Sequence, residues 1–250
     1  MTKVANLLVH GLYYNPVTML LVAACLVVAL LSGLGDNPEA VSGLFYPELD
    51  ISAPLTNTDG ISGPIIFLRT LTPIFLHFGA VHLIFNMLWL WYFGQQLERT
   101  QSSFIFLLLV FLFALIGNSA QYLFSGSTNF GGMSGVVYGL VGYIGVLNVF
   151  MPRSHIKLPI DMLIAFIIFL VVMAVIAGNS IANAAHMGGL FSGVLIGLAV
   201  ASYYIFILNR DAVGHPPPQP NNNKQNHTDQ MNPDETADSH SDSDDEWYRK

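Results

Sequence analysis

Charged residues are scarce in this chain: only 10% of its 250 residues are Asp, Glu, Lys or Arg, whereas 53% are hydrophobic. Soluble domains carry about 25% charged residues, so the composition argues against a soluble globular protein. Six of the seven excess negative charges lie in residues 211–250. The net negative charge of the chain therefore comes mainly from this C-terminal segment, and we expect no nucleic acid as a partner.

The sequence has a single cysteine, Cys25, which lies in an apolar run. One cysteine cannot form a disulfide within the chain. The sequence also lacks a His-Glu-x-x-His motif or a cluster of carboxylates and histidines. Since a metal site needs three or four ligands at short range, we expect no metal, and we expect no other cofactor. No clear signal-cleavage site follows the first apolar stretch, which is predicted to be a retained helix.

The chain contains long apolar runs instead. A helix needs roughly 18–20 apolar residues to cross about 30 Å of hydrocarbon, and several of the runs approach or exceed this length. We therefore predict an all-α, polytopic membrane protein with six transmembrane helices that lies in the lipid bilayer. The predicted spans cover residues 16–34, 76–97, 104–124, 134–151, 158–176 and 181–208.

The gaps between these runs predict the domain organisation. Residues 1–15 are predicted to be a short cytoplasmic N-terminus and residues 16–210 a six-helix membrane domain. Residues 211–250 have almost no large apolar side chain, so they are predicted to form a disordered acidic cytoplasmic tail. The long connection 35–75 contains apolar clusters and is predicted to be a partly ordered extracytoplasmic loop in the outer interface.

Lys and Arg residues near the span ends predict the orientation. If the N-terminus is cytoplasmic, five of the six basic residues in 1–210 lie inside and only Arg69 lies outside. Because cytoplasmic loops carry an excess of Lys and Arg, we expect both termini to be cytoplasmic.

Four polar side chains interrupt the apolar spans, where polar groups are expensive and usually functional. His82 and Asn86 lie in the second span, Ser134 begins the fourth, and His186 lies early in the sixth. These spans run in the same direction, so all four side chains are expected at similar depth in the outer half of the bilayer. His82 and Asn86 are four residues apart and share one helical face.

Ser134 is predicted to lie below the outer membrane surface, because the stretch 134–151 spans only about 27 Å as a helix. The polar segment 126–132 precedes it, and irregular backbone at this depth is tolerated only beside protein or a water-filled cavity. Glycines at intervals of four follow both Ser134 and His186 and would let the two helices approach closely. The glycines concerned are Gly135 and Gly139 in the fourth span, and Gly189, Gly193 and Gly197 in the sixth.

Such an approach would bring Ser134 and His186 into hydrogen-bonding reach. A serine becomes a good nucleophile when a base takes its proton, and His186 is the candidate base. The oxyanion that then forms needs fixed donors, for which His82, Asn86 and the Ser134 backbone N–H are the candidates.

These motifs resemble those of the rhomboid family of intramembrane serine proteases, over about residues 16–208. Gly132-x-Ser134-Gly135 is similar to the nucleophile motif of the family, Ala185-His186-x-x-Gly189-x-x-x-Gly193 to its base motif, and His82-x-x-x-Asn86 to its oxyanion motif. Tyr138 is similar to a family tyrosine that packs against the catalytic histidine.

The resemblance implies a Ser134–His186 dyad without an acidic third member, which cleaves transmembrane protein substrates in or next to their membrane helix. It implies that substrate enters beside the fifth span. A compact six-span member of this kind implies a bacterial inner (cytoplasmic) membrane, with the active site facing the extracytoplasmic side.

Two other classes remain as alternatives. One is a catalytically silent rhomboid-like binding or chaperone protein, although such relatives usually lack the serine or the histidine and this chain has both. The other is a small transporter or channel, which would predict repeated halves and broken helices. The sequence shows neither an internal repeat nor a charge deep in a span.

Overall fold

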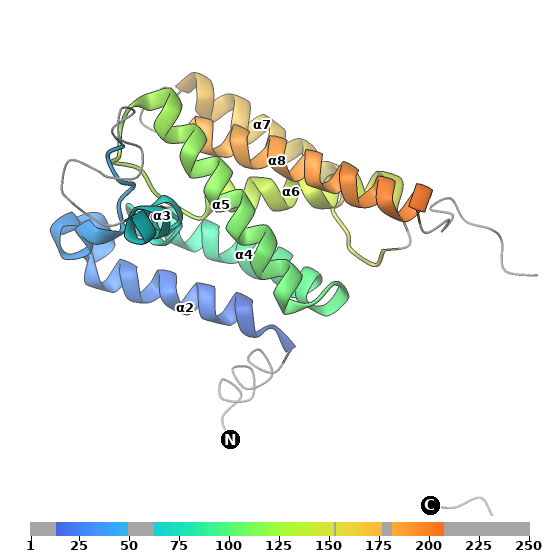
Figure 1. Cartoon of the computed structure of the whole chain (residues 1–250), viewed down its shortest axis with the longest axis horizontal. Coiled ribbons are helices and arrows are strands. Elements are labelled where there is room, and N and C mark those ends of the chain that lie inside the picture. The colour runs from blue at the N-terminus through green and yellow to red at the C-terminus, as the bar shows by residue number, and fades with distance from the viewer. Residues whose placement is uncertain (1–13, 50–62, 153, 177–181, 208–250) are drawn as a thin grey trace, which may run out of the picture. The chain divides into compact units, whose positions relative to one another are not determined.

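The computed structural model describes residues 14–49, 63–152, 154–176 and 182–207, and these residues form helices and turns with no strand among them (Figure 1). The prediction of an all-α chain is confirmed. The predicted tail 211–250 and nearly all of the predicted segment 1–15 lie outside the described residues. The helical elements are α2 (Pro16–Leu31), η1 (Gly33–Gly35), η2 (Pro38–Leu44), α3 (Gly63–Leu71), η3 (Thr72–Phe75), α4 (Ala80–Thr100), α5 (Ser103–Ser125), α6 (Ser134–Phe150), α7 (Ile160–Ile176), α8 (Asn183–Ser202) and the π-helical turn η5 (Tyr203–Ile207).

Two of the described helices are long and apolar enough to cross a membrane alone: α5, and α8 with its extension, Asn183–Phe206. The pair Gly63–Phe75 and Ala80–Thr100 also qualifies if it counts as one span, although it is bent by 99°. By length and composition, the described part of the chain thus contains two such helices, or three with the bent pair. The apolar helices α2, α6 and α7 are shorter, at 16 or 17 residues.

Helix α6 is the most enclosed element, and it packs most extensively on α8, which runs alongside α6 and α7 in Figure 1. The glycine faces of α6 and α8 meet. A Cβ atom on Gly189 would collide with the carbonyl oxygen of Gly135, and one on Gly193 would collide with that of Gly139. Small residues that let backbones touch are how helices associate in lipid, where no hydrophobic force drives them together.

Helix α4 begins at Ala80, four residues later than the second span was predicted to begin. The backbone is extended at Leu76, and Gly79 has a φ of 105°, which favours glycine and turns the chain into the helix. Hydropathy does not register this turn, because it carries no information on the direction of the chain.

The buried Glu98 near the end of α4 binds the beginning of α2. Its carboxylate accepts hydrogen bonds from the Val17 N–H (3.1 Å), the Thr18 N–H (2.7 Å) and the Thr18 hydroxyl (2.6 Å), and also from the Ser103 hydroxyl (2.6 Å). The N-cap residue of α2, Asn15, provides no side-chain hydrogen bond. Glu98 therefore satisfies donors that the first turn of a helix leaves unpaired.

The described parts of the connection between α2 and α4 contact α5. The Tyr46 ring stacks on Tyr122 with a centroid distance of 4.8 Å, and the Tyr46 hydroxyl lies 3.2 Å from that of Ser119. Arg69 Nε donates a hydrogen bond to the Phe45 carbonyl within the connection itself. These contacts place the chain before α4 against the end of α5 from which the site segment 126–133 departs.

Candidate active site

Ser134 is the first residue of α6, and Gly132, two residues earlier, has a backbone conformation that favours glycine. Gly132 has a φ of 123°, and a Cβ atom there would lie 2.6 Å from His82 Nε2. Both the backbone conformation and the close approach thus require glycine at this position. The segment before Ser134 consequently passes directly over the His82 side chain of α4.

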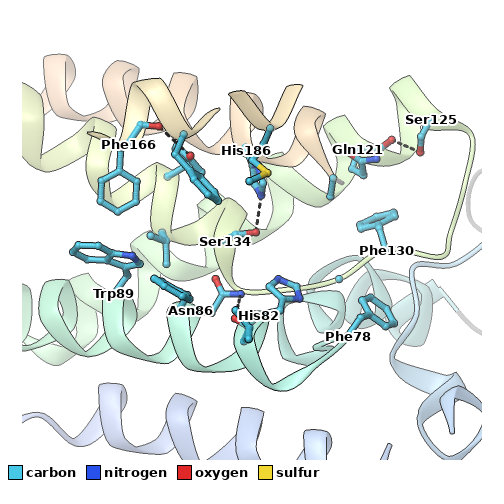
Figure 2. A pocket seen from close by; sticks show the side chains of 18 of the residues that line it. Phe78, His82, Asn86, Trp89, Gln121, Ser125, Phe130, Ser134, Phe166 and His186 are labelled. Atoms are coloured by element: carbon cyan, nitrogen blue, oxygen red, sulfur yellow. Dashed lines mark hydrogen bonds between the residues drawn. The ribbon is translucent and has the colours of Figure 1, made fainter. Parts of the chain in front are cut away.

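The Ser134 hydroxyl oxygen lies 2.7 Å from His186 Nε2, and His186 is only 5% exposed (Figure 2). His186 comes from the first turns of α8, so the contact joins the heads of the two helices that pack most closely. Among the described residues, His186 Nδ1 has no hydrogen-bond partner. A Ser134 hydroxyl that donates to Nε2 leaves the proton of a neutral imidazole on Nδ1.

Tyr138 lies one helical turn after Ser134 and packs on the His186 ring, with the ring centroids 4.9 Å apart and tilted by 32°. Its hydroxyl donates a hydrogen bond to the Phe166 carbonyl of α7 at 3.1 Å. Tyr138 therefore connects the imidazole on one side with the wall that α7 forms on the other.

His82 and Asn86 lie on the opposite side of Ser134 from His186, as Figure 2 shows. Asn86 is 5% exposed, and its Nδ2 donates to the His82 carbonyl at 3.1 Å. The second N–H of an amide nitrogen remains available to an acceptor near Ser134. The structure thus brings all four predicted side chains to one place, on α4, α6 and α8.

A cavity of about 780 Å³ contains these four side chains. Aromatic and aliphatic side chains of α4 and α7 line one part of it, and polar side chains near the end of α5 line another. The apolar part includes Phe85, Trp89, Met162, Phe166 and Phe169, and the polar part includes Gln121, Ser125, Ser127 and Asn129. The cavity therefore combines a large apolar surface with a few polar groups, as ligand-binding cavities usually do.

Metal ligands do not cluster within the described segments, which contain no group of three or more His, Cys, Asp or Glu side chains placed to bind an ion. The His77 ring lies beside that of His82, at a centroid distance of 5.1 Å.

Gln121 is a site residue that the sequence analysis did not single out. It lines the cavity, and its Oε1 accepts a hydrogen bond from the Ala185 N–H at 3.2 Å. The available signal was its polarity within the predicted third span, the same signal that identified His82 and Asn86 in the second.

The site thus combines a serine hydroxyl in contact with a buried imidazole and two further polar side chains, His82 and Asn86, inside the cavity of an all-α protein. The family model described as Rhomboid domain matches residues 66–203. The chain belongs to the rhomboid family, as the motifs indicated, and is a multi-pass membrane protein.

Curated relatives agree with this assignment. The chain is 33% identical over 183 residues to "Rhomboid protease GlpG" of Yersinia pestis (strain Pestoides F) and 35% identical over 183 residues to that of Yersinia enterocolitica serotype O:8 / biotype 1B. Each match covers 73% of this chain and 62% of the relative. The chain thus spans about 62% of the length of the curated relatives it matches.

Proposed function

We propose that this protein is an intramembrane serine endopeptidase that hydrolyses peptide bonds in or next to transmembrane segments of membrane-protein substrates. The observation that supports it most directly is the 2.7 Å contact between Ser134 Oγ and His186 Nε2 inside the cavity. The relatives that are named rhomboid proteases support the same activity.

In the proposed reaction, Ser134 Oγ attacks the carbonyl carbon of the substrate while His186 Nε2 takes the hydroxyl proton. The carbonyl oxygen becomes an oxyanion, which His82, Asn86 and the free N–H groups at the head of α6 stabilise. The imidazolium then gives its proton to the leaving amine, and an acyl-enzyme forms on Ser134. Water, deprotonated by His186, attacks that ester and releases the second product.

The proposed topology has six spans, α2 and α4 to α8, with both termini in the cytoplasm and the cavity open to the extracytoplasmic side of the inner membrane. Exposed aliphatic and aromatic side chains on the outer faces of α2, α5 and α7 support burial in lipid. At 17 residues, α6 is short for a span, which supports a position of Ser134 below the membrane surface.

The test is cleavage of a model single-span substrate by purified protein in proteoliposomes. Ser134→Ala and His186→Ala should each abolish cleavage and also labelling by a fluorophosphonate probe, while helical content and the unfolding temperature stay near those of the wild type. Ser192→Ala is the matched control, because Ser192 is another buried serine whose hydroxyl donates to the Gly189 carbonyl within α8.

Cleavage that persists in both Ser134→Ala and His186→Ala would overturn the proposal. A wild-type protein that neither cleaves nor reacts with the probe would leave the silent binding protein as the better description.

A further inference from the structure

The side chain of Gln121 reaches from α5 to the head of α8. Gln121 is 8% exposed and lies in the last turns of α5, and its Oε1 accepts the Ala185 N–H at 3.2 Å in a buried hydrogen bond. Its own backbone carbonyl accepts the Ser125 hydroxyl at 2.7 Å (Figure 2). Because only the amide oxygen can accept an N–H, this contact fixes the orientation of the Gln121 amide.

Ala185 is the third residue of α8, and it directly precedes His186. The first turn of a helix has N–H groups without an intrahelical acceptor, and a polar side chain at the N-cap usually supplies one. Here the N-cap residue is Ala182, which has no such side chain, and the first intrahelical bond is that from the His186 N–H to the Ala182 carbonyl. Gln121 therefore provides from another helix the acceptor that α8 lacks at its own beginning.

Two glycines, on α5 and α6, pack closely against the backbone carbonyl of Ala185. A Cβ atom on Gly117 of α5 would lie 3.1 Å from the Ala185 carbonyl oxygen, and one on Gly135 of α6 would lie 3.3 Å from it. The backbone of Ala185 is thus enclosed by α5 and α6, and Gly135 is the residue that follows Ser134. Ala185 is thus one of the residues through which the head of α8 contacts the helix that carries Ser134.

We propose that Gln121 is a positioning residue: its amide oxygen holds the first turn of α8 so that His186 Nε2 stays within hydrogen-bonding distance of the Ser134 hydroxyl. The proposal rests on the proposed function of Ser134 and His186. Helix ends fray when their donors are unpaired, and displacement of a catalytic group by about 1 Å reduces rates by about a hundredfold.

The experiment compares Gln121→Met, which has a similar shape without an acceptor, with Gln121→Glu, which keeps an acceptor oxygen. For Gln121→Met, kcat and the rate of fluorophosphonate labelling should fall by about tenfold to a hundredfold, with KM changed by less than about threefold. Gln121→Glu should retain most of the wild-type kcat, because it keeps an acceptor oxygen for the Ala185 N–H. Hydrogen exchange of the peptide that contains Ala185 should be faster in Gln121→Met than in the wild type.

Asn118→Leu is the matched control, because Asn118 is a buried amide on the same helix that donates to the Thr70 carbonyl at 2.9 Å and not to α8. It should lower the unfolding temperature about as much as Gln121→Met while exchange at Ala185 remains slow. A Gln121→Met variant with wild-type kcat, or a Gln121→Glu variant as impaired as Gln121→Met, would overturn the proposal.

Failure of the proposed function gives a different result. In that case the wild type shows neither cleavage nor labelling, and the exchange rates at Ala185 still report whether Gln121 holds the head of α8.

Discussion

Helices α6 and α7 have the same length, 17 residues, and both line the cavity, yet the protein encloses them very differently. Eleven residues of α6 are buried, whereas in α7 only Phe166 is. Composition explains the contrast. Helix α6 contains four glycines, and α7 contains none and is rich in Ile, Val and Phe.

In this protein the presence of small side chains on a helix, and not its hydrophobicity, therefore decides how closely the helix packs against its neighbours. Lipid is as apolar as a leucine side chain, so helices associate in it where small residues permit close backbone contact. The proposed nucleophile and base lie on α6 and α8, which satisfy this condition. Helix α7 forms one wall of the cavity. In the described part of the chain it is joined to α6 by the hydrogen bond from the Tyr138 hydroxyl to the Phe166 carbonyl.

The largest expected effect comes from breaking the α6–α8 contact. In Gly189→Ala the new Cβ would meet the Gly135 carbonyl, push α8 away from α6 and separate His186 from Ser134. We expect loss of cleavage and a destabilisation of about 1–3 kcal/mol, measured by thermal unfolding. Gly145→Ala is the control, since its Cβ would be 3.9 Å from the nearest atoms and should be tolerated. Equal effects of the two substitutions would contradict this explanation.

The next effect concerns the donors opposite the base. Asn86→Ala removes an amide from the side of Ser134 where the oxyanion is proposed to form, and kcat should fall by about a hundredfold to a thousandfold. Asn148→Ala is the control, because it removes an amide that donates to the Leu158 carbonyl, at the other end of α6. If Asn86→Ala changes KM alone, Asn86 binds substrate and does not stabilise the oxyanion.

Acidic pH should reduce cleavage by about tenfold per unit below the pKa of His186, because a protonated imidazole cannot take the Ser134 proton. This limb of the pH profile should depend on α6 and α8 and on His82 of α4, which lines the same cavity, and not on α7. Asp161→Asn, which removes an acid from the first turn of α7, should therefore leave it in place. A profile without an acidic limb at any pH at which the protein stays folded would argue against His186 as the base.

The smallest effect is expected where α7 meets α6. Tyr138→Phe removes the hydroxyl that donates to the Phe166 carbonyl and keeps the ring against His186. One hydrogen bond contributes about 0.5–1.5 kcal/mol, so the unfolding temperature should fall slightly and kcat should change by less than about tenfold. Loss of activity as complete as in Gly189→Ala would show that α7 is as essential to the site geometry as α8.

The sequence predicted the all-α character and the family, and both predictions are confirmed. It did so because apolar runs are long and the polar residues within them, such as Ser134 and His186, are few. The beginning of α6 at Ser134 coincides with the predicted beginning of the fourth span. The roles of the four site residues and the six-span count stay predictions.

Contacts between helices were not predictable in the same way. The Gln121–Ala185 hydrogen bond joins residues 64 positions apart, and it depends on how α5 and α8 are placed in space. The 99° bend before α4 lies at the predicted boundary between the connection 35–75 and the second span, but hydropathy carries no information on its angle. Pro73 and Gly79 lie beside the bend, and neither residue type specifies its angle.

The carboxylate of Glu98 has a consequence for biogenesis. Helix α2 precedes α4 in the chain, so the N–H groups of Val17 and Thr18 are made about 80 residues before the acceptor that pairs with them. Until α4 is made, these donors in the first turn of α2 depend on other partners, such as water. Once α4 is present, Glu98 pairs with the first turn of α2 and fixes the position along α4 at which α2 packs.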